Sequence, residues 1–176
     1  DYVVTNSTIF TNSDRITMQA HINWLGATSE ACTQSIFSYR DDSTPESLVI
    51  SINTAGTLVY YDGTDHYVGG TISPNEWTHI AVTMDFIEYR TTFYINGAES
   101  STHNNAKKPT HSSPLSFGAN YSGLSFSTVC APEFFNGMLD EIIIFDTVLT
   151  ESQIQYYGYT PPGPDDYPSD LIGFWR

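Results

Sequence analysis

The feature that most constrains the fold of this chain is a two-residue alternation of apolar and polar side chains. In the segment 15–24 every second residue is apolar, namely Ile16, Met18, Ala20, Ile22 and Trp24. Because successive side chains of a strand point to opposite faces, this pattern predicts a β-strand with one buried face. Similar short runs, rich in Val, Ile, Thr, Tyr and Phe, occupy residues 34–39, 47–53, 57–61, 78–84, 91–95, 115–119 and 138–145.

Turn signals separate these runs. Asp62-Gly63 and Asn96-Gly97 have the composition of tight turns, in which residues with positive φ reverse the chain, and Ala55-Gly56 is a third candidate. Short strands at roughly 8–12-residue spacing indicate an antiparallel sandwich rather than alternating βαβ units. The sequence therefore predicts an all-β fold built from two antiparallel sheets.

One short helix near residues 150–157 interrupts the strand pattern. Thr150 and Gln153 have the spacing of a capping box, and Gly158 is placed to end the helix. The segment 160–169 then contains four Pro in ten residues, which predicts a stiff strap or linker. The apolar run 171–175 beyond it is expected to return to the sandwich as a strand; the alternative is the start of a following domain.

The balance of charge argues against several classes of partner. The chain has 20 acidic and 6 basic residues and a net charge of −14, whereas contacts with nucleic acids or anionic membrane surfaces need clustered Lys and Arg. No apolar run approaches the roughly 18–20 residues of a membrane span, so direct membrane insertion is not expected. The residues 1–176 fit a single domain, which we expect to be joined to other domains of a larger parent protein.

The two cysteines, Cys32 and Cys130, leave two alternatives open. They are too few for a structural zinc site, but they could form one long-range disulfide or remain separate thiols. Bridged Cα atoms lie within roughly 7 Å of each other. A bridge would therefore require the segment 121–132 to run down the edge of the sandwich.

Four segments follow one another in an order that is typical of one superfamily. They are NEWTHIAVT at 75–83, FYING at 93–97, FNGMLDEIIIFD at 135–146 and VLTESQI at 148–154. This order resembles the laminin-G-like and pentraxin-like domains of the concanavalin A-like superfamily, and the strand 35–39 and the ending 171–176 look specifically pentraxin-like. The resemblance covers nearly the whole chain. It implies a jelly-roll β-sandwich whose rim loops bind calcium and often sugars, glycans or protein surfaces.

The resemblance also implies where a calcium ion would bind. Calcium takes six to eight oxygen ligands, and Asp41, Asp42 and Glu46 lie in the loop after the pentraxin-like strand, where pentraxins carry a ligand pair. The second pentraxin ligand loop falls on 119–133, which offers few ligands, so the two-calcium site is incomplete here. We expect one calcium, held by Asp41, Asp42 or Glu46 together with Asn120 or Glu133. The alternative is an acidic loop in contact with solvent.

Sugar binding usually needs an exposed aromatic ring that stacks on the sugar, with amides and carboxylates beside it. The candidates are tyrosines at predicted strand ends or in loops, namely Tyr39, Tyr61, Tyr67 and Tyr121. Each could instead be a half-buried residue at the edge of the sandwich. Trp24, Trp77 and Trp175 lie in strand patterns and are expected in the core.

The sequence does not predict catalysis. Glycoside hydrolases of this superfamily place their carboxylates in strings such as Glu-x-Asp-x-x-Glu on one strand, and the chain contains no such string. Asp140 and Glu141 are adjacent, so without a bulge their side chains would face opposite sides of a strand. The five histidines are scattered, and His79 is expected to pack within its strand.

These observations favour a non-catalytic, extracellular recognition module, assisted by calcium, that binds a glycan or a cell-surface protein within a larger adhesin or surface protein. A structural spacer without a ligand of its own is the main alternative. A glycoside hydrolase or polysaccharide lyase with an unusual site is the third.

Overall fold

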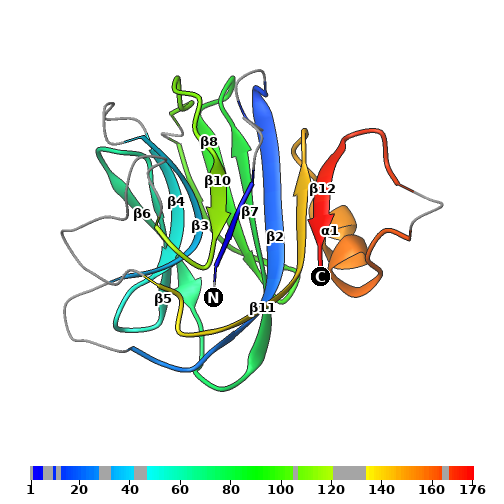
Figure 1. Cartoon of the computed structure of the whole chain (residues 1–176). Coiled ribbons are helices and arrows are strands. Elements are labelled where there is room, and N and C mark those ends of the chain that lie inside the picture. The colour runs from blue at the N-terminus through cyan, green and yellow to red at the C-terminus, as the bar shows by residue number, and fades with distance from the viewer. Residues whose placement is uncertain are drawn as a thin grey trace.

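The computed structural model describes residues 2–5, 10, 13–27, 33–41, 47–104, 107–120, 134–163 and 167–176. Within these ranges the chain forms two six-stranded antiparallel sheets that face each other, and one helix (Figure 1). The predicted all-β jelly-roll sandwich is confirmed. Cys32 and Cys130 lie outside the described residues, so the two alternatives for them stay open.

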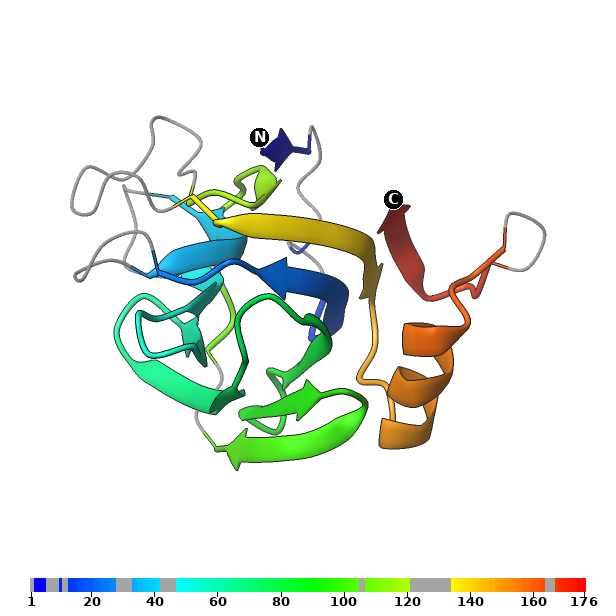
Figure 2. The same ribbon diagram turned by 90° about the horizontal axis from the view of Figure 1, so that it is seen from below.

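Each sheet combines strands from distant parts of the chain. The first, sheet A, has the order β1 (Val3–Val4), β10 (Leu115–Phe117), β3 (Gln34–Arg40), β4 (Ser47–Ile52), β5 (Thr57–Tyr61) and β6 (His66–Thr71). The second, sheet B, has the order β12 (Leu171–Trp175), β11 (Gly137–Phe145), β2 (Arg15–Trp24), β7 (Trp77–Asp85), β8 (Arg90–Ile95) and β9 (Ala98–His103). Strands β1 and β12 lie on the same side of the sandwich, one in each sheet (Figure 2).

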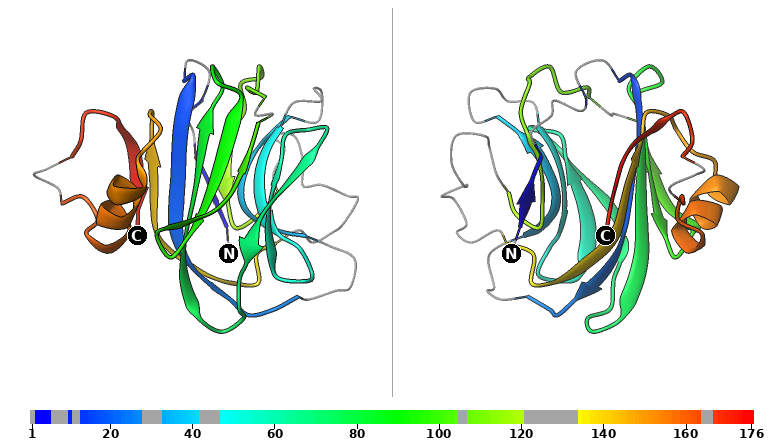
Figure 3. Two further views of the ribbon diagram at one scale, coloured as in Figure 1. Left: turned by 180° about the vertical axis from the view of Figure 1, so that it is seen from behind. Right: turned by 45° about the vertical axis from the view of Figure 1, so that its right-hand side comes forward.

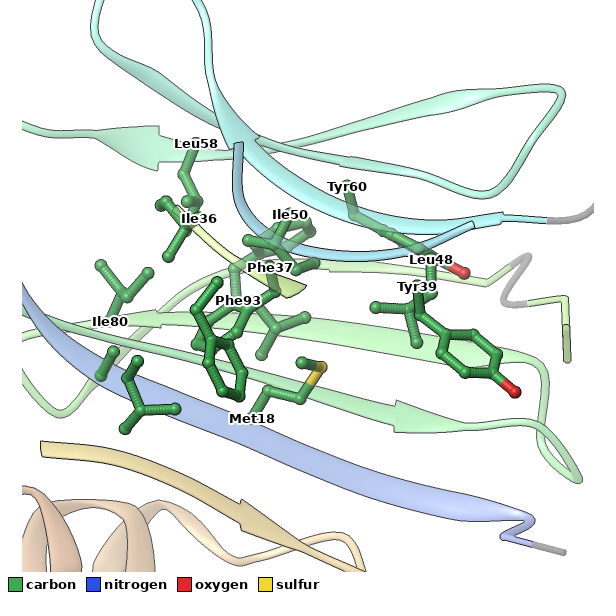
Figure 4. Close-up of a cluster of buried hydrophobic side chains, with 14 of the residues drawn as sticks. Met18, Ile36, Phe37, Tyr39, Leu48, Ile50, Leu58, Tyr60, Ile80 and Phe93 are labelled. Carbon is green, nitrogen blue, oxygen red and sulfur yellow. The ribbon is translucent and has the colours of Figure 1, made fainter. Parts of the chain in front are cut away.

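Apolar side chains from both sheets fill the space between them. In Figure 4, Met18, Ile80 and Phe93 of sheet B meet side chains of sheet A, and all three are fully buried. Met18 belongs to the alternating run that predicts β2. Burying a large apolar side chain contributes about 1.5–3 kcal/mol relative to leaving it exposed, so this layer is the main source of stability.

Strands β6 and β9 approach each other and close one side of the sandwich. The Ser101 hydroxyl donates a hydrogen bond of 2.8 Å to the carbonyl oxygen of Val68 in β6. Gly70 permits this approach, because a Cβ there would collide with Ser100 of β9 and with Ile95 of β8, and a Cβ on Gly69 would come within 2.8 Å of Phe93 in β8. Alternation does not predict these two strands, since β6 carries two glycines and β9 has no large apolar residue.

Helix α1 (Glu151–Tyr159) packs on the outer face of sheet B, on the side away from sheet A (Figure 3). The predicted capping box is present: the Thr150 side chain accepts a bond from the Gln153 backbone N–H, and the Gln153 side-chain oxygen accepts one from the Thr150 backbone N–H. The buried residue Ile154 joins Phe145 and Leu149 in a small second apolar cluster. The described part of the chain contains no helix long and apolar enough to cross a membrane.

Two further expectations are settled by the backbone. The Asn96-Gly97 hairpin is confirmed, with φ angles of 50° and 79° at its two residues. The apolar run 171–175 returns to the sandwich as β12, which pairs with β11.

Trp77 does not lie in the core, contrary to expectation. Its side chain is 51% exposed, whereas Trp24 is buried at 5%. The reason is the parity of β7: Ile80, Val82 and Met84 point into the core, so Trp77 shares the outer face with His79 and the other odd-numbered residues.

Candidate functional site

The outer face of sheet A carries a row of side chains that crosses five strands. Ser116 pairs with Ser38, Ser38 with Val49, Val49 with Tyr61, and Tyr61 with His66. Directly paired residues point to the same face of a sheet. Leu48 and Tyr60, which precede Val49 and Tyr61 in their strands, point to the other face and lie in the core. The row therefore forms a strip on the side of sheet A that faces away from the core, in which Ser38, Val49 and Ser116 are buried and only Tyr61 and His66 have exposed surface.

Tyr61 and His66 form an aromatic pair at one end of this strip. Their rings stack with centroids 4.6 Å apart and an angle of 27° between the planes. The Tyr61 hydroxyl donates a bond of 2.6 Å to the carbonyl oxygen of Gly63, which holds the ring in place. His66 is exposed and Tyr61 is partly exposed. The pair thus presents an aromatic surface in a fixed orientation.

Asn120, which the sequence offers as a calcium ligand, lies beside the other end of the strip. The hydroxyl of Ser38 donates a bond of 3.0 Å to Asn120 Oδ1, and Asn120 is 6% exposed. Asp41 follows the end of β3, three residues beyond Ser38, which corresponds to about 10 Å of strand. Asp41 and Asn120 therefore lie at different heights along β3.

Two of the proposed sugar-binding tyrosines face the core, which corrects that part of the prediction. Tyr39 is fully buried, and its hydroxyl donates a bond of 2.8 Å to the carbonyl oxygen of His111. Tyr67 is 6% exposed, and its hydroxyl donates to Asp62. Burial, with the nearby Asp62 carboxylate, raises the pKa of Tyr67 to about 12. Neither ring can stack on a sugar without opening the sandwich.

Asp62 is part of a turn, as expected. Its Oδ1 accepts bonds of 2.8 Å from the backbone N–H groups of Thr64 and Asp65. Lys107 Nζ lies 3.4 Å from Asp62 Oδ2. Burial would raise the pKa of Asp62, but these N–H groups, the Tyr67 hydroxyl and Lys107 together hold it below its ordinary value. The contacts of the Asp62 carboxylate with these groups therefore stabilise the β5–β6 turn.

The calcium hypothesis rests on residues that are only partly described. Asp42, Glu46 and Glu133, together with the fourth tyrosine Tyr121, lie outside the described residues. Among the residues that are described, no group of three or more His, Cys, Asp or Glu side chains could hold a metal ion. Calcium binding by Asp41 and Asn120 with these partners stays a prediction.

The acidic pair on β11 departs from simple alternation. Glu141 has φ of 48°, and the pairing of β11 with β2 shifts register between Asp140 and Ile143. Because of this bulge, Leu139 and Ile142 both pack against the core while the two acidic residues between them lie outside it. Glu141 Oε2 lies 3.5 Å from Nδ1 of His21 on the neighbouring strand.

A cleft opens between the edges of the two sheets, beside β1 and β12. It measures about 320 Å³, and its lining includes Tyr2, Phe117 and Trp175. The Trp175 ring packs 4.9 Å from the Phe117 ring, so Trp175 contributes to the core as expected. The floor of this cleft is the hydrophobic core itself.

Known proteins share this architecture. The chain superposes on the heptameric SAP-like pentraxin from Limulus polyphemus with a TM-score of 0.68 and 16% identity, covering 89% of this chain and 75% of that one. Domain 4 of an extracellular arabinanase from Geobacillus stearothermophilus, solved with arabinotriose, gives 0.64 and 22% identity, with coverages of 88% and 70%.

A third structure, provisionally named a carbohydrate binding protein from Bacteroides ovatus, gives a TM-score of 0.73 and 19% identity over 99% of this chain. The chain spans 48% of that protein, about half its length. A search of curated proteins finds no match. A sequence model of the concanavalin A-like lectin/glucanases superfamily matches residues 1–155, and the chain belongs to this superfamily.

Proposed function

We propose that this chain is a non-catalytic glycan-binding module whose binding surface is the outer face of sheet A around Tyr61 and His66. The observation that carries the proposal is the stacked and partly exposed Tyr61–His66 pair. Aromatic faces bind the apolar C–H face of a sugar ring, while neighbouring hydroxyls and carboxylates bind its hydroxyl groups. Asp65, next to His66, is such a carboxylate and has a side chain that is 61% exposed.

Two general properties indicate which glycans to test first. The net charge of −14 disfavours anionic glycans unless a cation bridges them to the protein. One structural neighbour is a domain solved with arabinotriose, an uncharged oligosaccharide. Neutral plant and bacterial polysaccharides, beginning with arabinan, are therefore the first ligands to examine.

The binding experiment compares the wild-type chain with four variants on a glycan array and in arabinan affinity gels. Tyr61→Ala and His66→Ala should weaken retention at least tenfold, whereas Tyr61→Phe, which keeps the ring, should retain most of the binding. Tyr89→Ala removes a 64% exposed tyrosine elsewhere and is the matched control. Equal retention by Tyr61→Ala and the wild type would refute this surface, and no retention on any glycan would favour the spacer alternative.

Calcium and an extracellular setting belong to the same proposal. Asp41, Asp42, Glu46, Asn120 and Glu133 would supply the calcium oxygens, and the parent would be a surface protein. Calcium at a hundred times its Kd should add about 2.7 kcal/mol of stability. The melting temperature in calcium should therefore exceed that in chelator, and Asp41→Asn should reduce the difference. Identical melting in calcium and chelator would remove calcium from the proposal.

A further inference from the structure

A polar pocket of about 330 Å³ lies on the outer face of sheet B, opposite in the molecule to Tyr61 and His66. It spreads over β7, β8 and β9, beside Val148 in the segment that leads into α1. The volume is at the lower end of the range that small-molecule sites occupy. Helix α1 and its leading segment cover the neighbouring part of this face through Leu149 and Ile154, and the pocket lies beside the covered part.

The strand register explains why this pocket is lined by hydroxyl groups. Thr83 pairs with Thr92, and Thr92 pairs with Thr102, so three threonines stand side by side on the same face. Adjacent strands are about 4.8 Å apart. The Thr92 and Thr102 hydroxyl oxygens lie 3.0 Å apart, and Thr102 donates to Glu99 Oε1 at 3.0 Å. Each hydroxyl can take part in three hydrogen bonds, so both retain capacity for a ligand.

Charged groups border the threonines, and the Asp85 carboxylate among them is already paired with an arginine. Asp85 pairs across the sheet with Arg15 on one side and with Arg90 on the other. The Arg15 Nε–H donates to Asp85 Oδ2 at 2.9 Å, while Asp85 Oδ1 accepts the backbone N–H groups of Ile87 and Glu88. Glu99 lines the opposite end of the pocket. Arg15 lies outside the lining, which carries Arg90, Asp85 and Glu99, so the pocket offers no excess of positive charge to an anionic ligand.

These observations point to a ligand that is neutral and rich in hydroxyl groups. A sugar hydroxyl both donates and accepts, so it can bond to a threonine hydroxyl and to a carboxylate in turn. Hydrogen bonds to charged partners contribute about 1.5–3 kcal/mol. An apolar ligand would not use the acceptor capacity that the threonine hydroxyls and the Glu99 carboxylate retain, and an anionic ligand would meet Glu99. We propose that this pocket binds one neutral sugar residue, which would give the module a second glycan site on the face opposite to Tyr61.

The test is a titration of the ¹⁵N-labelled chain with neutral sugars, in which the backbone amide chemical shifts are measured at each sugar concentration. The probes are L-arabinose, D-galactose, D-glucose and N-acetyl-D-glucosamine, each raised into the millimolar range. At least one probe should give saturable shifts in β7, β8 and β9. The double variant Thr92→Val, Thr102→Val keeps the shape of both side chains and should raise the Kd of these shifts at least tenfold. Thr71→Val, an exposed threonine on β6, is the matched control and should leave them unchanged.

The Tyr61→Ala chain separates this proposal from the proposed function, because the two sites lie on different sheets. Shifts in β7–β9 that persist in Tyr61→Ala and disappear in the double threonine variant support the second site, whatever happens at sheet A. Shifts confined to sheet A would overturn the second site and leave the Tyr61 surface intact. The absence of saturable shifts in β7–β9 with all four probes, or their survival in the double variant, would also overturn it.

Discussion

Among single residues, His79 is placed to make stability depend on pH. It is 2% exposed, and neither ring nitrogen has a hydrogen-bond partner within the described part of the chain. Burial, with the His21 ring 5.1 Å away, lowers the pKa of His79 to about 4. Glu141 faces His21, and the Tyr159 ring covers both histidines from α1. The folded chain therefore keeps His79 neutral under conditions in which the unfolded chain would protonate it.

We predict that the stability of the fold with a neutral His79 is complete above about pH 6.5 and is lost as the pH falls toward 4. The unfolded state binds the extra proton across this window, so the free energy of unfolding falls, by an amount on the order of 3 kcal/mol from this group. Urea unfolding of the wild type and His79→Gln at a series of pH values measures it. The difference in free energy of unfolding between the wild type and His79→Gln should narrow in acid. His66→Gln, which changes an exposed ring, should show the same pH dependence of unfolding as the wild type. A constant difference would contradict the prediction.

Asp62 gives a second prediction at this scale. It is 1% exposed and accepts bonds from two backbone N–H groups and the Tyr67 hydroxyl. Asp62→Asn removes the charge from this buried acceptor, and it should lower the free energy of unfolding by about 1–3 kcal/mol. Asp65→Asn changes an exposed carboxylate of the same turn and should cost no more than about 0.5 kcal/mol. Equal effects of the two variants in chemical unfolding would show that the bonds to Asp62 add nothing.

Elements with a clear local pattern could be predicted from the sequence. The other elements could not, because their positions depend on pairing between strands that are far apart in the chain. Leu58 and Tyr60 alternate within 57–61, so the outward direction of Tyr61 follows from its own strand. Tyr67 turns inward because β6 pairs with β5 in a register that places it beside Tyr60. The bulge at Glu141 and the polar edge strand β9 have no alternating signal, since tertiary contacts stabilise them. The outward direction of Tyr61 was therefore predictable from its own strand, whereas the inward direction of Tyr67 depended on the register of its pairing with β5.

Helix α1 shows how far a short local signal stabilises an element. Its capping box is complete, and only Ile154 and Gly158 of the helix are buried. Thr150→Ala removes the cap and should destabilise the chain by about 0.5–2 kcal/mol, whereas Thr150→Ser should preserve most of the stability. Hydrogen exchange should become faster in the first turn of α1 before it does in the core strands. Unchanged exchange there would mean that packing against Phe145 and Leu149, rather than the cap, determines where the helix begins.

At the scale of the whole molecule, the excess of acidic residues sets the electrostatic contribution to stability. With a net charge of −14, like charges repel one another more in the compact state than in the expanded chain. Screening shortens their range from about 30 Å at 0.01 M salt to about 8 Å at 0.15 M. We therefore predict that the melting temperature rises as NaCl is added across this range, and that tetramethylammonium chloride has the same effect, because screening does not depend on the identity of the cation. Calcium chloride at the same ionic strength should raise the melting temperature above the values in these two salts only if the chain has a specific calcium site. A melting temperature that falls with salt would show that ion pairs such as Arg15–Asp85 and Lys108–Asp14 outweigh the repulsion, and the acidic surface would then stabilise the fold through local pairing.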